Sequence, residues 1–192
     1  MSADQEHLRN LLQEIEPHDS FEAEQLSEAT HWVSATADLY RRVRHPVAPR
    51  QHLVSYFLLV DSASRAVLLG DHISSGLWLP SGGHVEPGED PAETVRRECL
   101  EELAVEARFH PRLGAKPLFI TITESTGQDT HLDVSLWYVL DGLEADELKP
   151  DPNEYLSVRW WPVAELRTAD PARFDPQLNR MLDKLEATLW RE

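Results

Sequence analysis

Three glutamates, Glu98, Glu101 and Glu102, stand at positions i, i+3 and i+4 of a segment with a helical pattern. At about 100° per residue, their side chains fall within an arc of roughly 100° on one helix face. Carboxylates at these spacings repel one another. Hard divalent cations prefer carboxylate oxygens, and Mg²⁺ is often held by few carboxylates together with substrate phosphate. The spacing leaves two interpretations, a divalent-metal site or a solvated acidic face.

A helix over Pro91–Ala104 is expected to position these acids. Asp90 can serve as its N-cap, and Pro91 suits the first helical position because the amide that proline lacks would have no partner there. A second face carries small and apolar residues: Ala92, Val95, Cys99 and Leu103. One side of the helix is therefore expected to pack on a sheet while an adjacent side presents the carboxylates.

The segment Gly83–Val105 reads GHVEPGEDPAETVRRECLEELAV. It resembles the box of the MutT-like Nudix hydrolase family, G-x5-E-x7-R-E-U-x-E-E-x-G-U, where U is apolar. The polar and glycine positions of that pattern are taken by Gly83, Glu89, Arg97, Glu98, Glu101 and Glu102. Cys99 takes an apolar position. Ala104 stands where the family has a glycine that ends the helix, which makes the next turn less free but removes no ligand.

The resemblance implies a fold and a reaction. The fold would be a Nudix-type α/β/α sandwich with a mixed sheet. The reaction would be divalent-metal-dependent hydrolysis of a pyrophosphate bond in a nucleoside diphosphate derivative or related small phosphorylated compound, with Mg²⁺ or Mn²⁺ as cofactor. The metal would neutralise phosphate charge and lower the pKa of a bound water. The sequence does not specify the substrate.

The same resemblance implies roles for box residues. The metal ligands would be Glu98, Glu101, Glu102 and a backbone carbonyl of Gly82 or Gly83. Glu98 and Glu102 are the expected catalytic residues, with Glu98 as the candidate general base. Glu89 and Arg97 are expected to form a structural ion pair that fixes the loop against the helix.

Four residues outside the acidic helix are possible accessory groups. Glu154 resembles the acid that often precedes an E-x5-W strand in relatives, and it is otherwise a turn residue. His84 could touch phosphate or pack locally. His131 and Asp133 alternate on one expected strand face and could reach the cleft, or they are polar residues of an edge strand.

The composition changes near residue 50, which divides the chain into a helical N-terminal extension (1–48) and a Nudix hydrolase domain (49–192). In the extension, Asp19 followed by Glu22 resembles a helix cap with its reciprocal acid. The domain alternates strand and helix patterns around a turn-rich stretch, Ser74–Asp90. Strands are expected at His52–Asp61, Ala66–Gly70, Lys116–Thr123, His131–Leu140 and Glu154–Trp161, with a turn at Gly127–Asp129, and further helices at Pro162–Leu166 and Gln177–Trp190.

Composition excludes several classes of function. The chain has 192 residues and a formal net charge of −16, so it would repel a nucleic-acid backbone at long range. No apolar run is long enough for a membrane span, and no secretory signal is visible at the N-terminus. A cytoplasmic protein is therefore expected. The N-terminal helices could cap the cleft, mediate a homodimer or extend the core.

Two alternatives to a hydrolase remain at this point. Some relatives use the fold as a non-catalytic nucleotide-binding sensor, but these carry a basic DNA-binding appendage, and the intact glutamates argue against lost catalysis. An isomerase-type relative acts on isoprenoid diphosphates with a catalytic cysteine. The single cysteine here, Cys99, lies on the expected packing face of the helix, which disfavours that reading.

Overall fold

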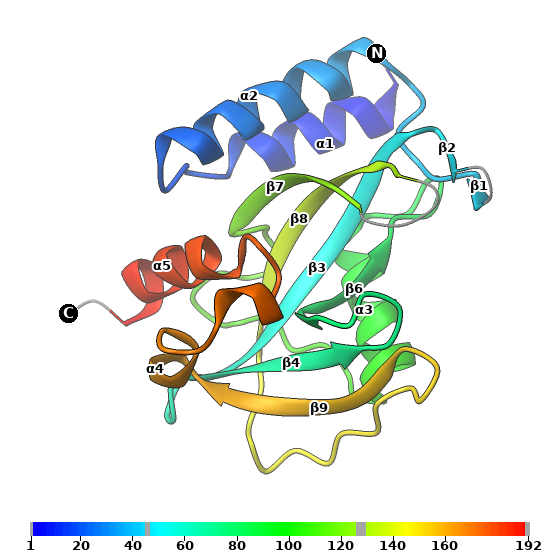
Figure 1. Cartoon of the computed structure of the whole chain (residues 1–192). Coiled ribbons are helices and arrows are strands. Elements are labelled where there is room, and N and C mark those ends of the chain that lie inside the picture. Colours follow the sequence, from blue (N-terminus) through cyan, green and yellow to red (C-terminus); the bar gives the residue numbers. More distant parts are fainter. Residues whose placement is uncertain (1, 45–46, 126–129, 191–192) are drawn as a thin grey trace.

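A mixed sheet of seven strands forms the centre of the molecule in the computed structural model, which describes residues 2–44, 47–125 and 130–190 (Figure 1). Its strands run in the order β5-β4-β3-β8-β7, with β6 also paired to β3 and β9 to β4. The central β3–β8 pair is parallel and the other pairs are antiparallel. The mixed α/β class inferred from the sequence is confirmed.

The sheet's strands are β3 (Gln51–Asp61), β4 (Ala66–His72), β5 (Trp78–Leu79), β6 (Ser81–His84), β7 (Phe119–Glu124), β8 (Leu132–Asp141) and β9 (Tyr155–Pro162). Two short strands, β1 (Val43–Arg44) and β2 (Val47–Ala48), pair only with each other. The helices are α1 (Ala3–Gln13), α2 (Ser20–Ala35), α3 (Pro91–Leu103), α4 (Val163–Leu166) and α5 (Leu178–Leu189), with a 3₁₀ turn at Pro171–Arg173.

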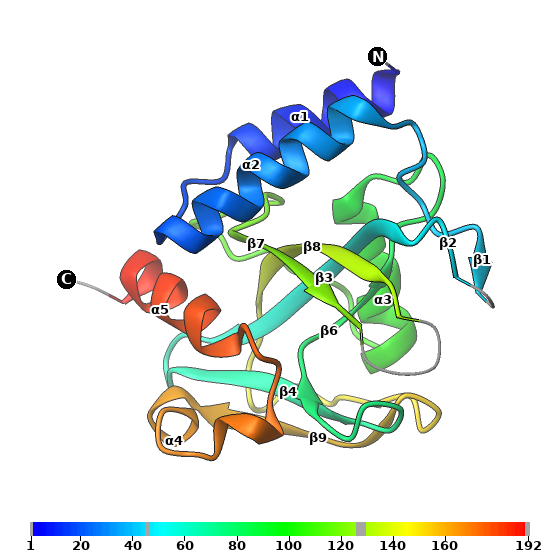
Figure 2. The same ribbon diagram turned by 45° about the horizontal axis from the view of Figure 1, so that its top comes forward.

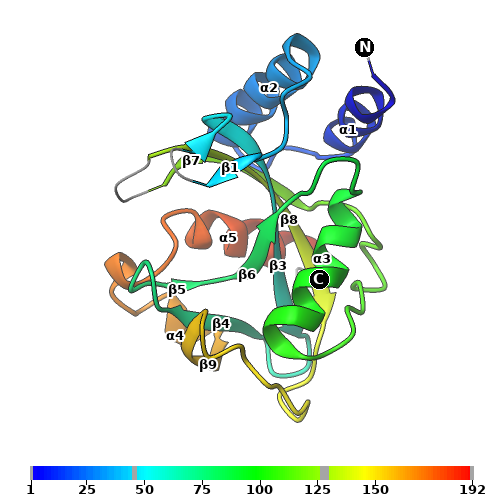
Figure 3. The same cartoon turned by 90° about the vertical axis from the view of Figure 1, so that its right-hand side faces the viewer.

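Helices cover both faces of the sheet, as Figure 3 shows with α3 on one side and α5 on the other. Alternation along β3 explains the two layers, because successive side chains point to opposite faces. Leu53 and Phe57 share a core with α1, α2 and α3. Leu58 and Val60 share a second core with α5. The result is the α/β/α sandwich that the sequence predicted.

The helix α3 starts and ends where its sequence directs. The Asp90 carboxylate accepts a hydrogen bond from the Ala92 amide at 2.7 Å, and Pro91 occupies the first turn. The Ser55 hydroxyl of β3 donates to the Pro91 carbonyl at 2.9 Å, which fixes this helix start on the sheet. At the other end, Ala104 adopts the left-handed conformation with φ = 57°, the geometry that a glycine adopts without strain.

The N-terminal helices pack beside β7 and reach α5 (Figure 2). The Gln25 amide donates to the Ile122 carbonyl of β7 at 3.0 Å. The carboxylate of Asp19 pairs with Arg180 at 2.6 Å, and that of Glu22 pairs with Lys184 at 2.6 Å. Two ion pairs therefore join the start of α2 to α5.

Several details differ from the sequence-based expectation. Asp19 caps α2, but Glu22 does not return a bond to the Asp19 amide; it accepts from the His18 amide instead and turns toward Lys184. The turn-rich stretch Ser74–Asp90 contains β5 and β6, which were not predicted because their residues have low strand propensity. Pairing with β4 and β3 outweighs that low propensity in the folded protein. The expected turn at Gly127–Asp129 lies outside the described residues. Within the described residues, no helix is both long and apolar enough to cross a membrane.

Candidate active site

Glu102 is the most enclosed of the three box glutamates, with only 8% of its surface exposed. Its Oε2 accepts a hydrogen bond from the Tyr155 hydroxyl at 2.7 Å and another from the Gly82 amide at 3.2 Å. Burial raises the pKa of this carboxyl to about 7, because desolvation disfavours the charged form more than the Tyr155 bond favours it. Helix α3, strand β6 and strand β9 all meet at this one side chain.

Glu98 faces the glycine strand one turn earlier on α3. A Cβ atom on Gly83 would collide with the Glu98 carboxylate, so only glycine lets this side chain approach the backbone so closely. Burial raises the pKa of the Glu98 carboxyl, and the Arg97 guanidinium, 2.6 Å from Oε1, opposes that rise. Glu98 is thus a desolvated carboxylate set against backbone.

Arg97 joins the loop before α3 to the helix. Its guanidinium donates to both oxygens of Glu89 at 2.9 and 3.1 Å and to the His84 carbonyl at 3.2 Å. The Glu89 carboxylate also accepts from the Thr94 hydroxyl at 2.7 Å and from the Glu86 amide at 3.0 Å. These bonds lower the pKa of Glu89 against the opposing effect of burial, so it remains an ion-pair partner.

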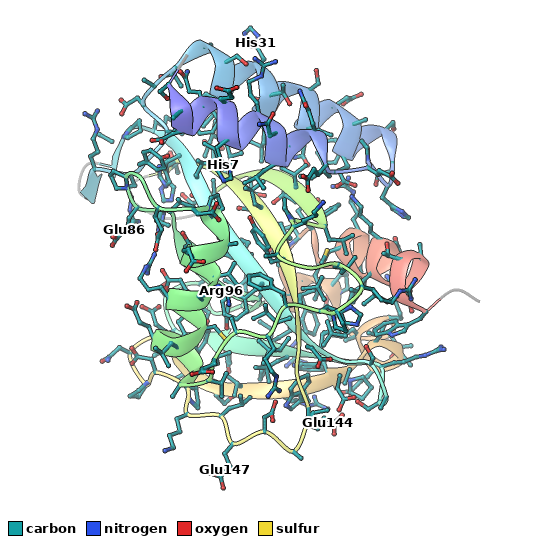
Figure 4. All side chains as sticks on the ribbon, turned by 180° about the vertical axis from the view of Figure 1, so that it is seen from behind. His7, His31, Glu86, Arg96, Glu144 and Glu147 are labelled. Carbon is teal, nitrogen blue, oxygen red and sulfur yellow. The ribbon has the colours of Figure 1, made fainter. Side chains whose placement is uncertain are left out.

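The outer rim of α3 is more open. The Glu101 side chain is 61% exposed and lies 3.4 Å from the Arg97 guanidinium. Figure 4 shows the molecule from behind, with Arg96 on α3 and His7 on α1. The His7 ring bonds to the Asp90 carboxylate at 2.6 Å, so the N-terminal extension contacts the start of the acidic helix.

The accessory candidates fall in two places. Glu154 lies beside Tyr155, and its carboxylate is 3.5 Å from the His72 ring nitrogen. It adds to the negative charge that raises the pKa of Glu102, so it lies near the box carboxylates. His84 and His131 instead gather around Asp133 at the start of β8, away from α3.

Two residues of these sites, Tyr155 and His52, were not predicted from the sequence. Tyr155 binds Glu102 across 53 positions of sequence, and its hydroxyl oxygen also lies 3.0 Å from the Ser81 hydroxyl. The only available signal was the position of Tyr155 directly after Glu154. His52, which is fully buried, lies 3.1 Å from Asp133. It sits in an apolar strand sequence that gave no reason to single it out.

Glu98 and Glu102 fit a divalent cation on chemical grounds. Both are carboxylates whose burial opposes ionisation, and a nearby cation would reverse that effect. Within the described part of the chain, the hydrogen bonds to Glu102 fall on Oε2, so its other oxygen is free to bind a metal. Glu101 and the backbone of Gly82 and Gly83 stand beside them as further oxygen donors.

Cys99 points away from this chemistry. It is buried in the core shared by α3 and the sheet. Burial raises the pKa of its thiol to about 12, so the nucleophilic thiolate is disfavoured. A cysteine-dependent isomerase is not supported by this environment.

Comparison with known proteins identifies the family. The model of the NUDIX domain matches residues 49–185 of the chain. The chain belongs to the Nudix family. A curated relative of this Nudix protein, the putative mutator protein MutT4 of Mycobacterium tuberculosis, is 28% identical over 131 residues, which cover 65% of this chain and 51% of that protein. The chain thus spans about half the length of this relative.

Solved structures share the fold of this Nudix protein. A NUDIX family hydrolase from Clostridium perfringens aligns with a TM-score of 0.53 at 21% identity, covering 71% of this chain and 97% of that one. The dihydroneopterin triphosphate pyrophosphohydrolase of E. coli aligns with a TM-score of 0.54 at 16% identity, covering 79% and 97%. At these identities the likeness shows the fold alone. Nudix proteins are generally pyrophosphohydrolases that use divalent metals.

Proposed function

We propose that this Nudix protein hydrolyses a pyrophosphate bond in a nucleoside diphosphate derivative or related small phosphorylated compound. One observation carries the proposal: Glu98 and Glu102 are desolvated side by side against the glycines of β6. An exposed acidic face would leave such carboxylates in water. Carboxylates buried beside open backbone are instead suited to a hard cation that also binds phosphate.

Glu98, Glu101 and Glu102 would hold Mg²⁺ or Mn²⁺, with a carbonyl of Gly82 or Gly83. When bound, the metal supplies charge neutralisation for the phosphates and a more acidic water. In the reaction, a water oxygen attacks one phosphorus while the bridging oxygen leaves with the other phosphoryl group.

Glu98 is the proposed general base that takes the proton of the water, since burial brings its pKa closer to neutrality. Tyr155 and the Gly82 amide hold the Glu102 carboxylate in place. Arg97 positions the loop through Glu89. Glu154 is retained as an accessory acid, because a loop acid near the carboxylates could replace Glu98 as the base.

The division of the chain at residues 48 and 49 is also proposed. The extension 1–48 would support the domain 49–192 through the buried face of α1 and α2 and through the His7–Asp90 contact.

A substrate panel tests the proposed activity. Nucleotide pyrophosphates and a pterin triphosphate, the compound class named for the E. coli structure, are incubated with Mg²⁺ or Mn²⁺, and the products are separated by chromatography. Glu98→Gln and Glu102→Gln should lose at least about 100-fold in kcat while keeping the native circular dichroism. Glu93→Gln is the matched control, because Glu93 lies on the same helix and pairs with the exposed Arg96 instead of facing the glycine strand.

Full activity in Glu102→Gln, or in excess chelator, would overturn the proposal. Nucleotide binding without turnover across the whole panel would favour the sensor alternative.

A further inference from the structure

Three histidines and an aspartate converge on the side of β6 that faces away from α3. His52 comes from β3, His84 ends β6, His131 precedes β8 and Asp133 lies on β8. The sheet register brings them together, because His52 is paired with Asp133 and His84 with the nearby Val54. One nitrogen or oxygen from each of the four side chains lies within 4.8 Å of the others.

The distances suit a single small ion. Asp133 Oδ1 lies 3.1 Å from His52 Nε2, 3.3 Å from His131 Nε2 and 3.9 Å from His84 Nε2. In a tetrahedral zinc site with bonds of about 2.0–2.1 Å, neighbouring ligand atoms are about 3.4 Å apart. Two of the three distances to Asp133 match that spacing, and the third needs only a small turn of a half-buried side chain.

Second contacts orient two of the rings. His52 Nδ1 lies 3.0 Å from the Pro49 carbonyl, which can only accept, so Nδ1 carries a proton. His131 Nδ1 lies 2.8 Å from the Ser125 hydroxyl oxygen. Histidines that bind metals almost always direct their other ring nitrogen to a carbonyl, carboxylate or similar partner. Both rings therefore present Nε2 to Asp133.

Two buried atoms at the centre of the cluster are placed to bind a cation. His52 Nε2 points at the Asp133 carboxylate, and Nε2 is the atom that a metal-bound imidazole with its proton on Nδ1 uses as ligand. Neither His52 Nε2 nor Asp133 Oδ1 has a hydrogen-bond partner among the described residues, and both atoms are buried. The 3.1 Å contact between these two atoms lacks the geometry of a hydrogen bond. An ion in the middle of the cluster would give both of these atoms a partner.

We propose that His52, His84, His131 and Asp133 form a binding site for a transition-metal ion of the zinc class. Three imidazoles and one carboxylate suit Zn²⁺ or Co²⁺, whereas Mg²⁺ prefers oxygen ligands. The site is separate from the box carboxylates. Gly83 faces Glu98, and alternation along β6 turns His84 to the opposite face. This site is independent of whether the chain hydrolyses pyrophosphates.

The bound ion would hold three strands together. His84 directly follows Gly82 and Gly83, so the metal would fix the end of the strand that contacts Glu98 and Glu102. The His84 side chain is 27% exposed, which gives the ion a route of entry. With four protein ligands, the site has the closed coordination of a structural zinc site.

Metal binding tests the proposal directly. The untagged full chain is stripped with chelator, loaded with Zn²⁺ or Co²⁺ and dialysed against buffer containing excess Mg²⁺. Metal content is measured by inductively coupled plasma mass spectrometry, and the Co²⁺ form is examined for the visible absorption of tetrahedral Co²⁺. One Zn²⁺ per chain is expected, with a higher Tm in the loaded protein.

Variants locate the ion. His131→Gln and His84→Gln should weaken Zn²⁺ binding at least about 100-fold, since even second contacts are worth about 10–100-fold. Ser125→Ala should weaken it about tenfold. His7→Gln is the matched control, because His7 pairs with the Asp90 carboxylate outside the four-residue cluster. If His131→Gln does not fold, His84→Gln at the most exposed ligand position supplies the measurement.

Three results would overturn the proposed zinc site. Wild-type protein that retains no Zn²⁺ would refute it, as would unchanged Zn²⁺ binding in both His131→Gln and His84→Gln. Zn²⁺ binding that disappears in the double variant Glu98→Gln/Glu102→Gln but persists in His84→Gln would place the ion at the box instead.

Discussion

The buried ion pair between α2 and α5 offers a sharp test of what holds the N-terminal helices in place. The Glu22 side chain is fully buried and that of Lys184 is 7% exposed, with 2.6 Å between the charged atoms. Burial lowers the pKa of Lys184, and the Glu22 carboxylate opposes that shift. Among the residues that the structure describes, Lys184→Met would leave the Glu22 carboxylate with two backbone amides as hydrogen-bond donors, from His18 at 2.6 Å and Ile120 at 3.4 Å.

The expected loss follows from that environment. Removing one partner of a buried pair destabilises a protein by about 3–5 kcal/mol. Because two backbone amides still donate to the Glu22 carboxylate, the loss for Lys184→Met should lie near the lower end of that range, at about 3 kcal/mol. Adding Glu22→Gln removes the stranded charge and keeps an oxygen for the closer amide, that of His18; the Ile120 amide, 3.4 Å from the other oxygen, loses its acceptor. The double variant should therefore recover about 2 kcal/mol relative to Lys184→Met alone.

Urea unfolding at pH 7, followed by circular dichroism, measures these differences. The exposed pair Lys116–Glu14, 2.8 Å apart and with side chains 61% and 41% exposed, is the matched control. Lys116→Met should change the unfolding free energy by less than about 1 kcal/mol. The reasoning fails if Lys184→Met is no more destabilising than Lys116→Met, or if the second substitution recovers nothing.

Four further variants have expected outcomes. Ala104→Gly should raise the unfolding free energy by about 0.5–1 kcal/mol, because glycine relieves the left-handed conformation; an unchanged urea midpoint would contradict this. Gly83→Ala should leave stability within about 1 kcal/mol, because only the end of a glutamate side chain must move, yet lower the proposed activity. Gly82→Ala, at φ = 146° against backbone, should destabilise more in the same urea assay. The Asp19 pKa is lowered to about 2 by Arg180, so the pair stabilises above the unfolded value near 3.8. After allowance for its partial exposure, the advantage of wild type over Asp19→Asn should be about 1 kcal/mol at pH 7 and disappear as pH falls from 4 to 2.

Local signals accounted for the acidic helix. Asp90, Pro91 and the apolar face around Val95 and Leu103 act within a few residues of one another, so α3 was predictable to its last turn. The approach of Glu98 to the glycine strand was implied by the family pattern. By contrast, β6 depends on pairing with β3, some 25 residues earlier, and its glycines carry almost no strand propensity.

The contacts that could not be predicted from the sequence depend on how distant strands pair. The His52–Asp133 contact requires parallel pairing of β3 and β8, and nothing local distinguishes that arrangement from an antiparallel one. The bond from Tyr155 to Glu102 similarly depends on how β9 pairs with β4. From local sequence, Glu22 resembled half of a capping box. Its actual partner, Lys184, lies 162 positions away and could not be recognised from neighbouring residues.

The central parallel pair also affects how the chain folds. The two strands, β3 and β8, are joined along ten registered positions by residues about 80 apart in sequence. Antiparallel neighbours such as β7 and β8 are close in sequence and can pair early, whereas closing the long crossover loses more chain entropy before it gains contacts. Until that closure, the apolar edge of β3 has unpaired backbone groups exposed. Productive folding and edge-to-edge association between molecules therefore compete for the same hydrogen bonds.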